Sequence, residues 1–302
     1  MRVSRATRTP LTVLGGFLGA GKTTLVNALL RQAQGLRLTV LVNDFGSVNI
    51  DAALIADRSG DTIALTNGCV CCAVGDDFAA GLAAALDRHP APDHVLIECS
   101  GVADPAAIAA IAQVDPELTL AGVVVLADTT GVAARLADPL LADTLRRQLR
   151  AADLLVLTKT DLAGDTAGLA ALLRPLAPRA AMARATHGDL PIAVALGEHA
   201  AGPRAAAPPA RHGTLFASVT LRPRRPLDAA ALRASLDALP DGVLRAKGIL
   251  PLADGTQALV QRVGRRLEIT CPAPDAPHAL VLIGTGTAPW DAAAALRPLG
   301  LE

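Results

Sequence analysis

The sequence predicts an α/β fold, with a doubly wound parallel sheet in the N-terminal part and a smaller α+β domain after it. Short apolar runs rich in Val, Leu and Ile, which suit strands buried on both faces, alternate with helix-length stretches. The expected strands are 11–14, 38–42, 95–97, 123–126 and 154–157. The expected helices are 23–34, 78–88, 105–114 and 143–150. In a sheet of this kind, ligands bind at the carboxyl ends of the strands.

The alternation fades near Pro191, and a stretch rich in Pro and Ala then predicts a linker. A chain of 302 residues with 51% hydrophobic content is long enough for two domains. We expect the first domain to span 1–197, the linker 198–212 and the second domain 213–302. The elements expected in the second domain are a strand at 213–221, a helix at 227–238, a hairpin of 257–263 with 265–270, and a strand at 279–283.

Charge and cysteine usage exclude several classes of protein. Lys plus Arg and Asp plus Glu both number 28, so the formal net charge is zero. This balance argues against a broad nucleic-acid surface, which needs clustered cations. No signal peptide or apolar stretch of membrane-spanning length is evident, and the five Cys lack the pairing pattern of a secreted disulfide scaffold. We expect a cytoplasmic protein with neither nucleic-acid nor membrane partners.

Residues 16–23 read Gly-Phe-Leu-Gly-Ala-Gly-Lys-Thr and fit the phosphate-binding pattern Gly-x-x-x-x-Gly-Lys-Ser/Thr. The motif lies between the first expected strand and the first expected helix, which is the context it requires. Backbone N–H groups of such a loop close around phosphate oxygens, and the helix N-terminus adds favourable partial charge. Lys22 is expected to reach the β and γ phosphates, and the Thr23 hydroxyl to bind Mg²⁺. The nucleotide-binding residues predicted here are Gly16, Gly19, Ala20, Gly21, Lys22, Thr23 and Thr24.

Glu98 and Gly101 follow the expected strand 95–97. In a P-loop hydrolase, a carboxylate at such a strand end acts on the Mg²⁺ side or on the attacking-water side of the site. A glycine three residues later can approach the γ phosphate. We therefore predict Lys22, Thr23, Glu98 and Gly101 as the catalytic residues.

The strand 154–157 runs into Thr158-Lys159-Thr160-Asp161, which is close to the Asn-Lys-x-Asp sequence by which GTPases read guanine. Asp161 would accept hydrogen bonds from guanine N1 and N2, while Lys159 would lie along the base. Adenine lacks those donors, and a buried carboxylate left unpaired costs about 1–3 kcal/mol. The motif therefore favours GTP over ATP, with Thr158, Lys159 and Asp161 as the base site. The alternative is a strand-to-helix turn with Asp161 as an N-cap.

Residues 67–72 read Asn-Gly-Cys-Val-Cys-Cys and hold three of the five Cys. Thiolates are soft ligands suited to Zn²⁺ or Cu(I), and a turn at Gly68 would let Cys69, Cys71 and Cys72 face one ion. The structural alternative is burial as small apolar residues. A functional alternative is a redox-responsive nucleotide-binding switch, in which Cys69 would pair with Cys72 because adjacent cysteines make a strained disulfide. An ATP-using kinase is a third interpretation.

The order of these motifs resembles the CobW-type family of P-loop GTPases, which includes zinc-regulated GTPase metalloprotein activators. More distantly, it is similar to the urease and hydrogenase nickel-insertion GTPases. The segments that carry the resemblance are the P-loop 15–24, the first switch 43–51, the Cys-x-Cys-Cys signature 67–72, the Walker B and second switch 98–105, and the C-terminal stretches 244–249 and 280–284.

The resemblance implies a GTP-hydrolysing metallochaperone that uses GTP and Mg²⁺. It would bind Zn²⁺, or else Co²⁺, through Cys69, Cys71 and Cys72, with a switch carboxylate such as Asp44 or a water completing the shell. The expected partners are a divalent metal and a client metalloprotein or the cobalamin pathway. The chain could also pair with a second copy as a homodimer.

The chain departs from the family pattern at several positions. Asp44 stands where the family usually has Glu, and Ser47 stands where it has another acid. Thr158 replaces the Asn of the guanine motif, and 177–178 read Ala-Pro where Asn-Pro is frequent near the base. The linker also lacks the His-rich run of many relatives.

Overall fold

The computed structural model describes residues 8–43, 62–65, 76–197, 216–240, 242–263, 266–270, 278–285 and 287–302. Its first sheet has the strand order β3-β2-β4-β1-β5-β6-β7, and every neighbouring pair is parallel. The strands are β1 Thr9–Gly16, β2 Leu38–Asn43, β3 Thr62–Leu65, β4 His94–Glu98, β5 Leu118–Asp128, β6 Leu154–Thr158 and β7 Ala181–Ala185. The helices that accompany it are α1 Lys22–Gln32, α3 Asp76–Leu86, α4 Pro105–Val114, α5 Val132–Ala137, α6 Ala142–Ala151, α7 Thr166–Leu173, η1 Arg174–Leu176 and α8 Ile192–Ala195.

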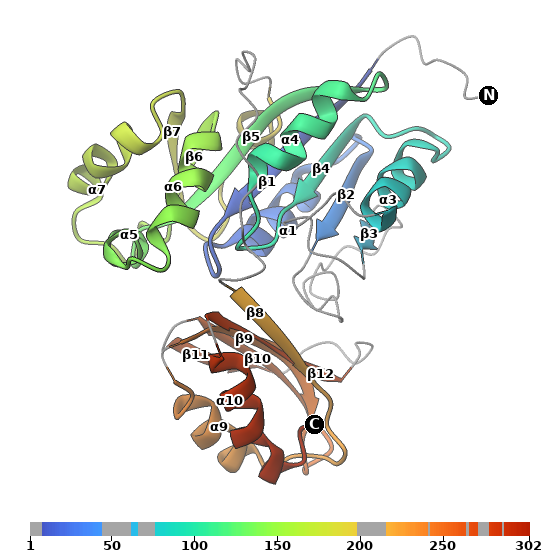
Figure 1. Ribbon diagram of the computed structural model, residues 1–302. Coiled ribbons are helices and arrows are strands. Elements are labelled where there is room, and N and C mark those ends of the chain that lie inside the picture. Colours follow the sequence, from blue (N-terminus) through green and yellow to red (C-terminus); the bar gives the residue numbers. More distant parts are fainter. Residues whose placement is uncertain are drawn as a thin grey trace.

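Helices cover both faces of this sheet, as Figure 1 shows for α4 and α6 in front and α1 behind. On one face Leu25 and Leu29 of α1 share a buried cluster with strand residues such as Val40. On the other face Ile108 of α4 and Leu145 of α6 belong to a second cluster. Apolar side chains on both sides of each central strand explain why these strands are rich in Val, Leu and Ile. The prediction of a doubly wound α/β sheet is confirmed.

All five expected strands are present, each longer than expected by at least one residue, and helix α4 has the expected bounds. The pattern missed β3, β7, α5, α7 and α8. Strand β7 reads Ala-Met-Ala-Arg-Ala, lies at the sheet edge and is only partly buried, so it has no apolar run to find. Strand β3 has four residues and helix α5 has six, which are lengths too short to show a period.

The second sheet is antiparallel, with the order β11-β10-β9-β12-β8. Its elements are β8 Phe216–Leu221, α9 Ala229–Asp237, β9 Val243–Pro251, β10 Gln257–Val263, β11 Arg266–Thr270, β12 Ala279–Thr285, α10 Ala288–Leu296 and η3 Arg297–Leu299. Leu236 of α9 and Leu296 of α10 pack on one face of it, against residues such as Leu250. The expected α+β domain is confirmed. The pattern missed helix α10, and it missed β9, whose apolar run is interrupted by charged residues at 245 and 247.

The other face of the second sheet is apolar at its centre. Ile249, Leu259, Val281 and Ile283 belong to the same buried cluster as Val13 of the first sheet. In Figure 1 the strands of the first sheet direct their carboxyl ends toward the second sheet. This places the second domain beside the edge where ligands of doubly wound sheets bind. The expected linker at 198–212 lies outside the described residues, so the domain boundaries stay a prediction.

Among the described residues, no helix has both the length and the apolar character needed to cross a membrane.

Candidate nucleotide site

The loop between β1 and α1 has the backbone that a phosphate-binding loop needs. Gly16, Gly19 and Gly21 have φ of 132°, 76° and 97°, in the left-handed region that favours glycine. At Gly16 a Cβ would also lie 2.7 Å from the carbonyl oxygen of Leu126 on β5. A side chain is therefore excluded at Gly16 both by conformation and by the neighbouring strand.

The ammonium group of Lys22 lies inside the curve of this loop. Its Nζ donates to the carbonyl oxygens of Gly16 at 2.8 Å and of Phe17 at 3.3 Å, and the residue is buried. These carbonyls hold the positive charge at the mouth of helix α1, where backbone N–H groups also converge. An anion that enters the loop therefore meets both a cation and a helix N-terminus.

Thr23 and Glu98 bring two hard oxygen donors together at the carboxyl edge of the sheet. Thr23 Oγ1 donates to Glu98 Oε1 at 3.1 Å, and Glu98 is 3% exposed. Strand β4 pairs with β1 so that Glu98 stands level with Leu14, just before the loop. Hydroxyl and carboxylate oxygens are the ligands that Mg²⁺ prefers, so the pair fits that ion.

Gly101 lies in close contact with Leu18 of the phosphate-binding loop. A Cβ on Gly101 would lie 2.4 Å from Leu18 Cδ2 and 2.8 Å from the Leu18 nitrogen. The buried Gln148 of α6 holds this segment, because its Nε2 donates to the carbonyl oxygens of Gly101 at 3.2 Å and Ala103 at 2.9 Å. The glycine is thus required for close contact between the segment after β4 and the loop.

The predicted base site lies at the end of β6 and is tied to the loop. Thr158 Oγ1 donates to the carbonyl oxygen of Ala20 at 2.8 Å. Lys159 has a left-handed φ of 57°, and Asp161 follows it with a side chain 34% exposed. The alternative role of Asp161 as a helix N-cap is wrong, because α7 is capped by Asp165, whose carboxylate accepts from the Gly168 nitrogen.

A buried carboxylate at the end of β5 supports this loop. Asp128 is 3% exposed; its Oδ2 accepts from Lys159 Nζ at 2.8 Å and its Oδ1 accepts from Thr130 Oγ1 at 2.6 Å. Arg135 adds a second cation 3.6 Å away. Burial acts to raise the pKa of Asp128, but the hydrogen bonds from Lys159 and Thr130 outweigh it and hold the pKa below its ordinary value. The carboxylate is therefore ionised at neutral pH.

The loop after β7 also reaches the base site, which the sequence did not indicate. Thr186 Oγ1 lies 2.9 Å from Thr160 Oγ1, and His187 Nε2 lies 3.7 Å from Asp161 Oδ2. The expectation that 177–178 lie near the base is wrong. These two residues precede β7 and so lie at the amino edge of the parallel sheet, opposite the site.

A cavity of about 620 Å³ joins these parts, a size that suits a small-molecule ligand. The predicted catalytic and nucleotide-binding residues all line it except Gly16 and Gly101, which shape the loop from behind. The second sheet supplies further lining residues that the sequence did not indicate. These are Arg245, Ala246, Lys247, Leu259, Gln261, Arg262 and Glu268.

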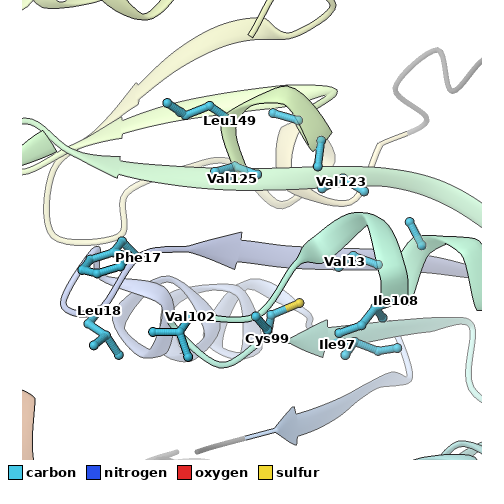
Figure 2. Packing of buried hydrophobic residues seen from close by; sticks show 14 of the residues in the cluster. Val13, Phe17, Leu18, Ile97, Cys99, Val102, Ile108, Val123, Val125 and Leu149 are labelled. Carbon is cyan, nitrogen blue, oxygen red and sulfur yellow. The ribbon is translucent and has the colours of Figure 1, made fainter. Parts of the chain in front are cut away.

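The predicted metal ligands Cys69, Cys71, Cys72 and Asp44 lie outside the described residues. Within the described ranges, no three His, Cys, Asp or Glu residues gather as a metal ion would require. Cys99 is a free thiol in the buried cluster with Val13, Ile97 and Ile108 (Figure 2). Burial raises the pKa of the Cys99 thiol far above its ordinary value, which makes it unreactive.

Family comparison assigns both halves of the chain. Residues 10–184 match the CobW/HypB/UreG nucleotide-binding domain, and residues 216–298 match the cobalamin synthesis protein cobW C-terminal domain. The chain belongs to the CobW/HypB/UreG family. The resemblance drawn from the order of the motifs is confirmed.

Curated relatives of this CobW-type chain carry chaperone names. It is 39% identical over 220 residues to "Zinc chaperone CobW" of Sinorhizobium sp, a match that covers 62% of each chain. It is 36% identical over 188 residues to "Zinc chaperone YjiA" of Escherichia coli strain K12, covering 60% of this chain and 58% of the relative. The matches thus span less than two thirds of these relatives. The solved Zn(II)-bound YjiA GTPase from E. coli is 27% identical with a TM-score of 0.49, covering 97% of this chain and 99% of that one.

Proposed function

We propose that this chain hydrolyses GTP and carries zinc to a client metalloprotein. The observation that carries the proposal is the 3.1 Å contact between Thr23 Oγ1 and Glu98 Oε1, in one cavity with Lys22 and Asp161. A cation, a Mg²⁺-type oxygen pair and a guanine-type carboxylate are the parts that GTP hydrolysis needs. Relatives named zinc chaperone and zinc-regulated GTPase metalloprotein activator support the cargo and the reaction.

The phosphate end of GTP would bind in the loop at 16–23. Lys22 would exchange its carbonyl partners for the β and γ phosphate oxygens, and the backbone N–H groups at the start of α1 would bind the remaining oxygens. Thr23 and Glu98 would hold Mg²⁺, which supplies positive charge at the phosphates when bound. Gly101 lets the segment after β4 approach the γ phosphate without a side chain in the way.

The base would bind between the ends of β6 and β7. Asp161 would accept hydrogen bonds from guanine N1 and N2, and Lys159, held by Asp128, would lie along the ring. Thr158 links this loop to Ala20 of the phosphate-binding loop at 2.8 Å, so the base and phosphate ends of the site keep a fixed spacing. The nearby Thr186 and His187 would close the outer side of the base.

The cargo would be Zn²⁺, with Co²⁺ as the alternative, on the thiolates of Cys69, Cys71 and Cys72, and with Asp44 or a water completing the shell. In sequence this motif lies between the switch-like segments 43–51 and 98–105. GTP would order those segments and assemble the ligands, and hydrolysis would release them. The protein would act in the cytoplasm, with the client docked partly on the C-terminal domain 213–302.

Hydrolysis is tested by phosphate release from GTP with Mg²⁺. We expect wild-type activity, with Thr23→Ala and Glu98→Gln each lowering kcat by about 100-fold or more, since each removes a group from the charge-stabilising set. Asp143→Asn, on an exposed carboxylate of α6, should leave the rate unchanged. An inactive wild-type chain, or full activity in both cavity variants, would contradict the proposal.

Metal carriage is tested by equilibrium Zn²⁺ titration in the presence of Mg²⁺ with GTP or with GDP. We expect tighter binding with GTP, and loss of the tight site when Cys69, Cys71 and Cys72 are replaced by Ser while hydrolysis is retained. Affinity should fall with acid, because ligand thiols must be deprotonated. Equal zinc affinity in the two nucleotide states would remove the gating step.

A further inference from the structure

One face of the second sheet carries a row of polar residues that line the nucleotide cavity. In the antiparallel register Lys247 of β9 pairs with Gln261 of β10, and Gln261 pairs with Glu268 of β11. Cross-strand partners lie on the same face of a sheet, so the three residues form one line across three strands, and all three line the cavity. Arg245, two residues before Lys247, is on the same face and also lines it. The row is therefore built by strand register and not by a loop.

The row sits beside apolar residues on the same face of the sheet. Ile249 pairs with Leu259 in the next row of the same face, and both belong to the buried cluster that includes Val13 of the first sheet. The opposite face of the sheet is covered by α9 and α10. Lys247 is only 5% exposed and Arg245 is half-buried. These two cations are thus held at the wall of the cavity that faces the phosphate-binding loop.

Arg262 lines the same cavity but has a different role. Its guanidinium donates to the carbonyl oxygens of Val243 at 2.9 Å and Leu239 at 2.8 Å, inside its own domain. Its side chain therefore stabilises the second domain, and the cavity wall receives its cationic character from Arg245 and Lys247.

The charges on this wall match a polyphosphate. Arg245 and Lys247 stand across the cavity from the loop that holds Lys22, and guanidinium and ammonium groups bind phosphate oxygens through strong charge-assisted hydrogen bonds. Glu268, at the outer end of the row, carries the opposite charge. We propose that Arg245 and Lys247 contact phosphate oxygens of the nucleotide held in the loop, so that the C-terminal domain forms part of the nucleotide site. This inference rests on the proposed GTP binding.

One consequence is a direct connection between the nucleotide and the domain expected to meet the client. A ligand that contacts both domains stabilises their docked arrangement by the amount by which it binds that arrangement more tightly than the undocked one. Loss of phosphate oxygens on hydrolysis and release then weakens that arrangement. The nucleotide thereby acts on the C-terminal domain through the side chains of Arg245 and Lys247.

The test is fluorescence titration of the full chain with a fluorescent GTP analogue and Mg²⁺, using charge-neutralising variants. We expect Arg245→Gln and Lys247→Gln each to raise Kd about tenfold or more, as loss of a hydrogen bond to a charged group predicts. Glu268→Gln removes a negative charge from the same row and should lower Kd a few-fold. Arg233→Gln is the matched control, because Arg233 is exposed on α9 on the far face.

The possible results distinguish failure of this inference from failure of the proposed function. If Arg245→Gln and Lys247→Gln bind the analogue as Arg233→Gln does, the inference is wrong while GTP binding by the loop stands. If the wild-type chain binds no GTP, the proposed function fails first. Thermal unfolding of each variant, measured alongside, identifies one that fails to fold. If the Lys247 variant fails to fold, the Kd values of Arg245→Gln and Glu268→Gln decide whether the inference holds. Weaker binding by Glu268→Gln would overturn the role of charge in this row.

Discussion

Lys159 Nζ donates to Asp128 Oδ2 at 2.8 Å across neighbouring strands of the first sheet. Asp128 ends β5 and is the register partner of Thr158 at the end of β6. The next residue, Thr129, donates from Oγ1 to the carbonyl oxygens of Thr158 at 2.8 Å and Lys159 at 2.9 Å. The base-reading loop is therefore held from the end of β5 by the ion pair of Asp128 with Lys159 and by hydrogen bonds from the backbone and the hydroxyl group of Thr129. This arrangement makes Asp128 a positioning residue for the proposed guanine site.

Asp128→Asn should weaken GTP binding roughly tenfold, because it replaces a hydrogen bond between charged groups with a neutral one. The ratio of GTP to ATP affinity should fall as well, since Lys159 and Asp161 share the loop that loses its support. Competition of GTP and ATP against a fluorescent GDP analogue measures both effects. Asp143→Asn serves as the control. An unchanged GTP to ATP ratio would count against a role for Asp128 in specificity.

Gly101→Ala should destabilise the protein by about 1–3 kcal/mol and weaken nucleotide binding, because the new methyl group overlaps the backbone of Leu18. Backbone atoms cannot move aside as a flexible side chain can. Gly164→Ala is the matched control, since its Cβ would meet nothing within 4 Å. Urea unfolding and nucleotide titration of both variants test this. Equal stability of the two alanine variants would show that the loop accommodates the methyl group.

The stability of the chain should fall between pH 6.5 and about 4 because of His94. Burial lowers the pKa of His94 from 6.5 to about 4, and Thr12 Oγ1 lies 2.8 Å from its Nε2. The unfolded chain takes up a proton in this window while the folded chain does not, so unfolding becomes more favourable as pH falls. The loss is up to about 3 kcal/mol and is complete below pH 4.

The measurement for this effect is urea unfolding at pH 7.5 and pH 4.5 for the wild type and for His94→Gln. Glutamine keeps a polar group near Thr12 but does not titrate. The variant should therefore lose less stability on acidification than the wild type, by an amount that isolates the His94 contribution. The same acid sensitivity in both proteins would assign the effect to other groups.

Cys99 should resist alkylation in the folded protein. Its thiol is buried and its pKa is raised, so almost no reactive thiolate forms. Peptide mapping after brief iodoacetamide treatment should find Cys99 unmodified under native conditions and fully modified in urea. Rapid native labelling would mean that the cluster around Val13 and Ile108 opens readily.

The central strands and the phosphate-binding loop were predictable because each carries a strong local signal. A buried parallel strand such as β4 is an unbroken apolar run, and the Gly-x-x-x-x-Gly-Lys-Thr spacing follows from the backbone turns that phosphate binding requires. The structure adds the contact between Thr23 and Glu98, which arises because the parallel strands β1 and β4 are neighbours and end at one edge of the sheet.

The missed parts of the site depend on tertiary packing that leaves no local pattern. Asp128 is a single carboxylate after β5, and only its contact with Lys159 reveals its role. Thr186 and His187 follow β7, an edge strand with little apolar character. Arg245 and Lys247 resemble the charges of any half-exposed strand until the second sheet is placed against the cavity. No spacing rule connects these residues to the loop, because they are distant in sequence.

Because Val281 and Ile283 belong to the same hydrophobic cluster as apolar residues of the first domain, part of the cover of that cluster comes from the second sheet. A shortened protein that stops before the linker would leave apolar side chains of its first half bare and prone to aggregate. Heating the intact chain should accordingly melt both halves together in one cooperative step. The small C-terminal half in this sense completes the hydrophobic cover of the large one.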